Sequence, residues 1–233
     1  MDSRLVHHPA APQAQVRMVE RLVSLEPRAR VLDLACGRGR QTLELSRRSH
    51  RVLGIDSREE LLAEARRAAR EERLNVHFLN TDIRRISYRG EFDLVVNLCF
   101  ALSYLPEDRD HLRVLEGVRK GLKVGGRLIL DLLNKEWLMR RLDAGDAFDF
   151  EAGRLAAAGS WPSLRVYTLT ELKALLERAG LEFRQVVGGY EGESYGADSP
   201  RMVVLAQRPT EAPVRRPVEE LDSAIRIKGR GPR

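Results

Sequence analysis

Short apolar runs alternate with amphipathic stretches from residue 29 to residue 134, and this alternation limits the fold more than any other feature. The apolar runs occupy residues 29–37, 50–56, 75–82, 91–100 and 125–134. The segments between several of them space their apolar residues as a helix does. Runs that are apolar throughout are typical of parallel strands covered by helices on both faces. The chain is therefore predicted to be a doubly wound α/β protein.

The end of the chain departs from this alternation. Residues 181–190 and 201–209 are strand-like runs joined by a polar segment without helical spacing, so they are predicted to pair as an antiparallel hairpin. The prediction is a mostly parallel seven-stranded sheet that finishes with one reversed strand at its edge. Residues 13–26 are predicted to form a helix that lies over the start of the sheet.

Two later helices are predicted to begin with capping boxes. Ser57 with Glu60, and Thr168 with Glu171, have the required spacing. Gly180 is expected to stop the second of these helices, because glycine readily adopts the left-handed conformation that ends a helix.

Length and charge set the domain organisation. With 233 residues, 43% of them hydrophobic, the chain can bury one sizeable core. Residues 1–208 are predicted to form a single domain, with a lid-like insertion at 135–165 that begins with a short helix. Residues 209–233 are predicted to be a flexible basic tail. Residues 208–233 hold seven Lys or Arg and four Asp or Glu, so they carry +3 of the net charge of +6. The remaining positive charge is expected on solvated helix faces.

Several other classes of protein and site are disfavoured. Two cysteines are too few for a disulfide framework, and no apolar run reaches the ~18 to 20 residues of a membrane span. The N-terminus lacks the apolar run of a signal peptide, so a cytoplasmic protein without a membrane partner is predicted. His7 and His8 have no third ligand at metal-site spacing, and no metal is expected. Cys36 and Cys99 could form a redox pair, although burial as small apolar side chains is favoured.

Residues at the carboxyl ends of the predicted strands are the candidates for ligand binding, because ligands of open α/β sheets bind at that edge. Gly37 and Gly39 allow a tight turn and a close approach of ligand to backbone. Asp56, 17 residues after Gly39, is placed to accept hydrogen bonds from ribose hydroxyls. Asp82 ends the third run, and Asn97 lies near the end of the fourth.

The loop after the first run is not a dinucleotide-binding fingerprint. Thr42 stands where that fingerprint needs a third small residue. Asp33 would also lie unfavourably close to a pyrophosphate. A ligand that has a ribose and a positive charge, but no phosphate, fits these residues better.

Five segments at the predicted strand ends share their order and spacing with one known family. They are VLDLACGRGR, VLGIDSR, NTDI, FDLVVNLCFALSYL and LKVGGRLILDLLN. Together they resemble the S-adenosylmethionine-dependent methyltransferases with a seven-stranded Rossmann-like sheet. The resemblance covers about residues 13–208 and includes the final hairpin, and residues 165–209 are similar to the small-molecule-type members. It implies S-adenosylmethionine as the cofactor.

The resemblance also implies roles for individual residues. The cofactor-binding set that it implies is Asp33, Ala35, Gly37, Gly39, Asp56, Ser57, Asp82, Ile83 and Asn97. Asp33 would lie near the methionine end, with the backbone from Ala35 to Gly39 around the methionine and ribose. Asp56 would hold both ribose hydroxyls. Asp82 would accept from the adenine amino group, the Ile83 amide would meet a ring nitrogen, and Asn97 would face the methyl-donor side.

The implied reaction is an in-line displacement at a methyl group that the sulfonium already activates, so the protein contributes positioning and a desolvated approach. A general base is optional. For a hydroxyl acceptor, the pocket residues that could take or relay its proton are Tyr104, Asp131, Asn134 and Tyr167. Packing is the ordinary role of a tyrosine near a strand end.

The predicted acceptor is a small molecule. Methylation of RNA or protein with the help of the basic tail is an alternative, but the fourth run ends in NLCF rather than in the Asn-Pro-Pro-aromatic signature of many nucleic-acid methyltransferases. A catalytically silent cofactor-binding module is a second alternative. The chain departs from the family pattern in two places: Ala35 stands where many members have Gly, and the 135–165 segment looks short for the strands that relatives often carry there.

Overall fold

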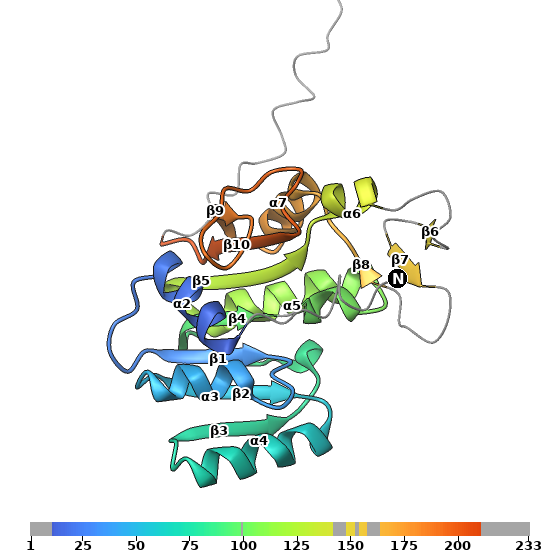
Figure 1. Ribbon diagram of the computed structural model, residues 1–233. Helices are drawn as coiled ribbons and strands as arrows, with labels where there is room; N and C mark the ends of the chain where they lie inside the picture. Colours follow the sequence, from blue (N-terminus) through green and yellow to red (C-terminus); the bar gives the residue numbers. More distant parts are fainter. Residues whose placement is uncertain (1–10, 99, 142–147, 152–153, 158–163, 211–233) are drawn as a thin grey trace, which may run out of the picture.

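A seven-stranded sheet forms the centre of the molecule in the computed structural model, which describes residues 11–98, 100–141, 148–151, 154–157 and 164–210. Its strands are β1 (Arg30–Leu34), β2 (Arg51–Asp56), β3 (Val76–Asn80), β4 (Phe92–Asn97), β5 (Leu122–Leu133), β9 (Glu182–Val187) and β10 (Arg201–Gln207). They lie in the order β3-β2-β1-β4-β5-β10-β9 (Figure 1). The strands β1 to β5 pair in parallel, and β10 pairs antiparallel with both neighbours. The predicted mostly parallel sheet is confirmed.

The reversed strand is not at the edge, contrary to the prediction. β10 lies between β5 and β9, with Val204 opposite Leu130 on one side and opposite Val186 on the other. The five central residues of β10 are all buried, whereas β9 carries several exposed residues. A strand that is apolar on both faces is better buried between two neighbours, and a polar strand tolerates the exposed edge.

Helices cover both faces of the sheet. They are α2 (Pro12–Leu22), α3 (Arg40–Arg47), α4 (Glu59–Glu71), α5 (Asp108–Gly121), α6 (Lys135–Arg141) and α7 (Leu169–Arg178). One buried cluster joins α2 and α3 to one face of the sheet, and another joins α5 and α7 to the opposite face. Val16 and Val19 anchor α2 over the central strands, as predicted. The helix ends at Leu22 rather than at residue 26, because Val23 already has an extended backbone.

One of the two predicted capping boxes is present. The Thr168 hydroxyl accepts a hydrogen bond from the Glu171 amide, and the Glu171 carboxylate accepts one from the Thr168 amide. The predicted box of Ser57 with Glu60 is wrong. The residue before α4 is Arg58, whose amide donates to the carboxylate of Asp56 at 2.9 Å. The helix thus begins one residue later than the predicted box requires, and no described side chain caps it.

The insertion after β5 contains more structure than its length suggested. It begins with the predicted helix, α6, and continues into β6 (Phe148–Glu151), β7 (Arg154–Ala157) and β8 (Leu164–Arg165). These strands form a separate antiparallel sheet in the order β6-β7-β8. The expectation that the segment is too short for additional strands is therefore wrong.

The ends of the chain fall mostly outside the described residues. Of the predicted tail at 209–233, the structure describes residues 209 and 210. His7, His8 and Cys99 also lie outside the described residues. Within the described ranges, every helix is too short or too polar to cross a lipid bilayer.

Candidate active site

The carboxyl ends of the parallel strands lie on one edge of the sheet. In Figure 1 the arrowheads of β1, β2, β3 and β5 point toward the side of the molecule that carries β7 and β8. Two short 3-10 helices, η1 (Ile83–Arg85) and η2 (Ala101–Tyr104), follow β3 and β4 at this edge. The predicted cofactor residues at the ends of β1 to β4 are therefore neighbours across adjacent strands.

The loop between β1 and α3 has the backbone conformation that its glycines allow. Ala35, Gly37 and Gly39 have φ values of +55°, +55° and +72°. A Cβ atom on Gly39 would lie 3.0 Å from side-chain atoms of Ala65 and Phe78, so glycine permits close packing there. A Cβ on Gly37 would have no atom closer than 3.9 Å, and this part of the loop leaves room for a ligand at the backbone.

Asp56 joins this loop to the end of β2. Its side chain is 2% exposed. The carboxylate accepts hydrogen bonds from the Gly37 amide at 2.9 Å and from the Arg58 amide and Nε at 2.9 and 3.2 Å. These contacts fix an acceptor group between the loops that follow β1 and β2. Ser57, the next residue, is exposed.

Asp33 places a second buried carboxyl group beside the same loop. It is 3% exposed and accepts a hydrogen bond from Thr42 Oγ1 at 2.5 Å. Burial raises the pKa of Asp33 to about 7; the Thr42 bond opposes the shift, and the charge of Asp56 adds to it. A cationic ligand group nearby would favour the ionised form. Thr42, which stands where the dinucleotide fingerprint needs a small residue, thus holds the Asp33 carboxyl group in place.

Cys36 lies inside the loop as a free, buried thiol. Burial raises its pKa, and the nearby charges of Asp33 and Asp56 add to the shift. A thiol with a raised pKa is a poor nucleophile. Its burial matches the favoured interpretation as a small apolar side chain.

Asp82 follows β3 and caps η1. It accepts a hydrogen bond from the Arg84 amide at 2.8 Å, and both of its oxygens bind the Arg84 guanidinium. The hydrogen bonds from Arg84 hold the pKa of Asp82 below its usual value. Arg84 also donates to Asp110 on α5 at 3.1 Å. Ile83, beside Asp82, is buried.

Asn97 ends β4 and is 1% exposed. Its Nδ2 donates to the Leu34 carbonyl, and its Oδ1 accepts from the Leu102 amide, both at 2.9 Å. The side chain therefore ties the end of β1 to η2. Sequence reasoning assigned Asn97 to the methyl-donor side and did not foresee these two contacts.

Asp131, a predicted pocket residue, is part of a buried ion pair. Both of its oxygens lie 2.9 Å from Arg201 Nη1, and the Tyr190 hydroxyl donates to it at 2.5 Å. The Arg201 guanidinium also lies over the rings of Phe100 and Tyr190, at 4.6 and 4.5 Å from their centroids. Burial and the charge of Asp131 raise the pKa of Tyr190.

Asn134 holds a loop in place. It has no exposed surface, and its Nδ2 donates to the carbonyls of Gly196 and Ser199 at 3.0 and 2.9 Å. Its Oδ1 accepts from the Glu136 amide at 3.0 Å and from the Tyr195 hydroxyl at 3.2 Å. This side chain connects β5 to the segment before β10.

Tyr167 pairs with a histidine that the sequence reasoning did not single out. The Tyr167 hydroxyl lies 2.5 Å from Nδ1 of the fully buried His111, and His111 Nε2 lies 3.1 Å from the Leu105 carbonyl. Because a carbonyl only accepts, Nε2 carries the proton and Tyr167 donates to Nδ1. Burial lowers the pKa of His111 and raises that of Tyr167. Tyr104, the fourth candidate, is half-buried against the cluster around Phe100.

A buried polar chain connects these regions and was also missed. Gln41, in the first turn of α3, donates to Gln15 on α2 at 2.6 Å. Gln15 donates to the Tyr190 hydroxyl at 2.9 Å, and Tyr190 donates to Asp131. The sequence held one signal: Gln15 precedes Met18 and Val19 at the three- and four-residue spacing of an apolar helix face. A polar residue on that face indicates a buried partner.

Comparison with known proteins agrees with this geometry. Residues 31–126 match the family model described as a methyltransferase domain. This segment makes up less than half of the chain. It contains the loop after β1, Asp56, Asp82 and Asn97.

Similar proteins extend the comparison beyond that segment. A crystal structure of an S-adenosylmethionine-dependent methyltransferase from Clostridium acetobutylicum aligns with a TM-score of 0.76, at 19% identity, over 88% of this chain and 95% of that one. A 1,6-didemethyltoxoflavin-N1-methyltransferase from Burkholderia thailandensis, crystallised with S-adenosylhomocysteine, aligns with a TM-score of 0.62, at 19% identity, over 89% and 80%. The chain therefore has the α/β fold of the S-adenosylmethionine-dependent methyltransferases.

A curated relative is more similar in sequence. The trans-aconitate 2-methyltransferase of Deinococcus radiodurans is 35% identical over 144 residues, which are 60% of this chain and 52% of that protein. The aligned part of the chain spans about half the length of that protein and of the Bacillus subtilis relative described as a putative methyltransferase.

The residues of the segment 31–126 fit S-adenosylmethionine. This cofactor has a positively charged methionine end and a ribose but no phosphate. Asp33 and Asp56 supply two buried carboxyl groups beside a loop that leaves space at Gly37. Asp33 forms no ion pair with a described residue, and a buried carboxyl group of this kind favours a cationic ligand, whereas Asp56 is already paired with Arg58.

Proposed function

We propose that this chain is an enzyme that transfers the methyl group of S-adenosylmethionine to a small molecule. The observation that carries the proposal is the buried Asp56 carboxylate, held against the Gly37 amide at the junction of two strand-end loops. The small-molecule acceptor is supported by the methyltransferases of Deinococcus and Burkholderia, whose names specify small acceptors.

Each residue of the cofactor set has a proposed task. Asp33 binds the positive methionine end, and Asp56 accepts from the ribose hydroxyls. Asp82 accepts a hydrogen bond from the adenine amino group while its oxygens also bind Arg84. The Ile83 amide donates to a ring nitrogen of the adenine. The loop of Ala35, Gly37 and Gly39 surrounds the methionine and ribose, Ser57 lies at its rim, and Asn97 positions η2 beside the methyl group. S-adenosylmethionine, when bound, supplies a methyl group that its sulfonium has already activated.

The acceptor-side residues are proposed to shape the pocket rather than to move a proton. Asp131, Asn134 and Tyr167 each have strong partners within the chain, so using one of them as a base would first break those contacts. Tyr104, which is half-buried, is the candidate for direct contact with the acceptor. The insertion at 135–165 forms the lid, because its strand β8 and helix α6 pack with Phe100 at the end of β4. Excluding water then favours the displacement.

The proposal includes a cytoplasmic location. Its support is the free thiol of Cys36, because reducing compartments keep thiols from forming disulfides. Fractionation of cells that express the tagged chain tests this part.

Calorimetric titration with S-adenosylmethionine, S-adenosylhomocysteine and NAD tests the cofactor assignment without knowledge of the acceptor. We expect binding of the first two compounds and none of NAD. Asp56→Ala should weaken cofactor binding at least about tenfold, since each hydrogen bond to a carboxylate contributes about 1.5 to 3 kcal/mol. Asp93→Ala is the matched control, because Asp93 lies at the opposite end of β4, where it binds Lys123.

Two results would contradict the proposal in different ways. Unchanged affinity in Asp56→Ala would remove the ribose assignment. Tight cofactor binding without turnover across a broad panel of small acceptors would favour a catalytically silent module.

A further inference from the structure

Three cavities adjoin one another at the amino ends of β1, β2 and β3, on the edge of the sheet opposite to the candidate active site. Their volumes are about 510, 590 and 320 Å³. Asn75, just before β3, borders all three, Arg51 borders the first and the third, and His77 borders the first and the second. The three cavities, which meet around the amino end of the edge strand β3, are together called here the amino-edge cleft.

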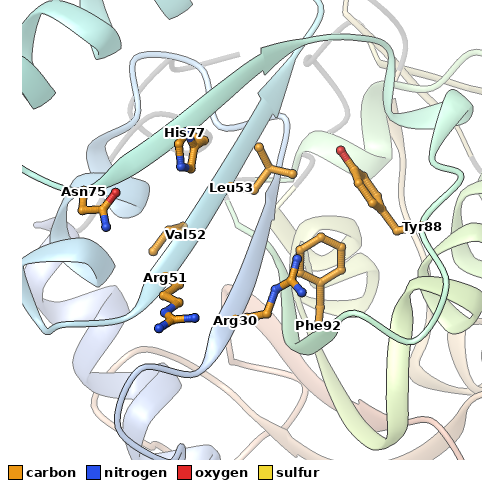
Figure 2. A pocket seen from close by; sticks show the side chains of 8 residues that line it. All are labelled: Arg30, Arg51, Val52, Leu53, Asn75, His77, Tyr88 and Phe92. Carbon is orange, nitrogen blue, oxygen red and sulfur yellow. The ribbon is translucent and has the colours of Figure 1, made fainter.

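The cleft is open because the connection from β3 to β4 is short. Residues 81–91 contain only η1 where a doubly wound fold commonly has a helix. Leu53 and His77, which are register partners on β2 and β3, therefore face the first cavity (Figure 2). Leu79, two residues beyond His77 on the same face, is 44% exposed.

The charge of the cleft has one sign. Its lining includes Arg28, Arg30, Arg51, Arg66, Arg70 and Arg73 and, among the described residues, neither Asp nor Glu. Arg30 binds Glu91 at 2.9 Å, and Arg66 binds Glu59. The side chains of the other four form neither an ion pair nor a hydrogen bond within the described part of the chain. An uncompensated group of arginines creates a positive potential that attracts anions.

Aromatic and apolar groups lie next to these arginines. Tyr88 and Phe92 line the first cavity and pack edge to face, with ring centroids 5.1 Å apart. Figure 2 shows Leu53 between His77 and Tyr88 on the wall of that cavity. Guanidinium groups bind phosphates, and aromatic faces stack with nucleobases. A cavity of this size can hold one nucleoside unit.

We propose that the amino-edge cleft binds single-stranded nucleic acid. One base lies against Tyr88 and Leu53 in the first cavity, and the backbone phosphates follow Arg51, Arg28 and Arg73 into the adjoining cavities. A strand is favoured over a free nucleotide because unpaired arginines line all three cavities, and one nucleotide fills only one of them. The site is separate from the cofactor edge and does not depend on the proposed methyl transfer.

Fluorescence anisotropy with a labelled single-stranded RNA of about 12 nucleotides tests the proposal, since single-strand binding sites span about 4 to 16 nucleotides. The full chain should bind, with an affinity that falls as salt is raised from about 50 to 200 mM. Arg51→Glu with Arg73→Glu should weaken binding at least about tenfold and lower the salt slope by about 1.4, at about 0.7 per phosphate contact. Tyr88→Ala should weaken binding about fivefold or more through the lost stack, and should leave the binding of inorganic polyphosphate unchanged.

The matched control is Arg113→Glu with Arg178→Glu, which changes the charge equally on α5 and α7. Both arginines are exposed and lack ion pairs within the described ranges. Equal loss of RNA binding in the control, an unaffected Tyr88→Ala, or no binding by the full chain would each overturn the proposal. Equal affinity for a mononucleotide would overturn the strand as the occupant. Cofactor titration of every variant shows whether the fold and the other edge are intact, so the two proposals fail separately.

Discussion

The two edges of the central sheet hold their charged side chains in opposite ways. At the carboxyl edge, Asp56 and Asp82 are each bound by donors of the chain, and Asp33 is held by Thr42. At the amino edge, Arg51 and Arg73 project into open cavities with no ion pair to a described residue. One edge is pre-organised around buried acceptors, and the other presents exposed donors.

This difference has an energetic consequence. Removing one partner of a buried polar pair leaves the other unsatisfied and is costly. Removing an exposed, unpaired charge changes stability little. Substitutions at the carboxyl edge should therefore reduce stability as well as function, whereas substitutions at the amino edge should affect only what binds there.

The largest effect is expected for Asp131→Ala. It leaves the largely buried Arg201 guanidinium and the Tyr190 hydroxyl without their shared acceptor, so the free energy of unfolding should fall by about 3 to 5 kcal/mol. Urea denaturation measures this, with Asp93→Ala, which breaks a partly exposed pair with Lys123 and a bond from the Arg30 amide, expected to cost less, about 1 to 2 kcal/mol. If Asp131→Ala does not fold, Asp131→Asn provides the measurement. Equal losses at Asp131 and Asp93 would contradict the comparison.

Two tyrosine-to-phenylalanine substitutions compare the edges directly. Tyr190→Phe removes the hydroxyl that links Gln15 to Asp131 and should lower the free energy of unfolding by about 1 to 3 kcal/mol. Tyr88→Phe, at the amino edge, removes a hydroxyl that bonds to none of the described residues, so the change should stay within about 0.5 kcal/mol. Thermal or urea unfolding of the two variants measures these changes. A larger loss of unfolding free energy in Tyr88→Phe than in Tyr190→Phe would contradict the comparison of the two edges.

The raised pKa of Asp33 makes cofactor binding depend on pH. The cationic end of the cofactor favours the ionised carboxylate, so at pH 6 affinity should be about tenfold weaker than with Asp33 fully ionised. Asp33 ionises at higher pH in the folded than in the unfolded chain, so its contribution to stability is lost as pH rises from about 4 to 7. Calorimetry between pH 5.5 and 7.5 measures the affinity. Asp33→Asn should flatten both profiles, and a pH dependence that persists in this variant would assign it to another group.

The sequence was sufficient to predict site residues that lie at the end of a strand. It was not sufficient to predict residues whose role depends on a partner far away in the chain. Asp33, Asp56 and Asp82 could be located because each lies at or near the end of a predicted strand, and a parallel sheet brings such ends together. The contact of Gln15 with Tyr190 joins residues 175 positions apart, and no local pattern specifies it. The capping box of Ser57 was wrong because α4 begins at Glu59, after Arg58, whose amide binds the Asp56 carboxylate.

The position of the reversed strand was missed for a related reason. Hairpin pairing of β9 with β10 follows from their adjacency in the chain, but which of them pairs with β5 does not. That choice depends on burial of both faces, which is a property of the assembled sheet. The second small sheet was missed because its short strands lie among glycines and alanines, which are weak strand formers.

The smallest effect is expected for Arg51→Ala. This variant tests whether the arginines of the amino edge contribute to the stability of the fold. Arg51 is exposed and lies among other unpaired arginines, so its removal relieves repulsion, and the free energy of unfolding should change by no more than about 0.5 kcal/mol. Any gain should appear at low salt and vanish at about 1 M salt, where the screening length falls to about 3 Å. The matched control is Arg47→Ala, which breaks pairs with Glu72 and Glu44 and should destabilise the fold. An equal loss of unfolding free energy in Arg51→Ala would mean that Arg51 supports the fold. A loss confined to Arg47→Ala would mean that the positive charge of the cleft does not stabilise the fold, as expected of a binding surface.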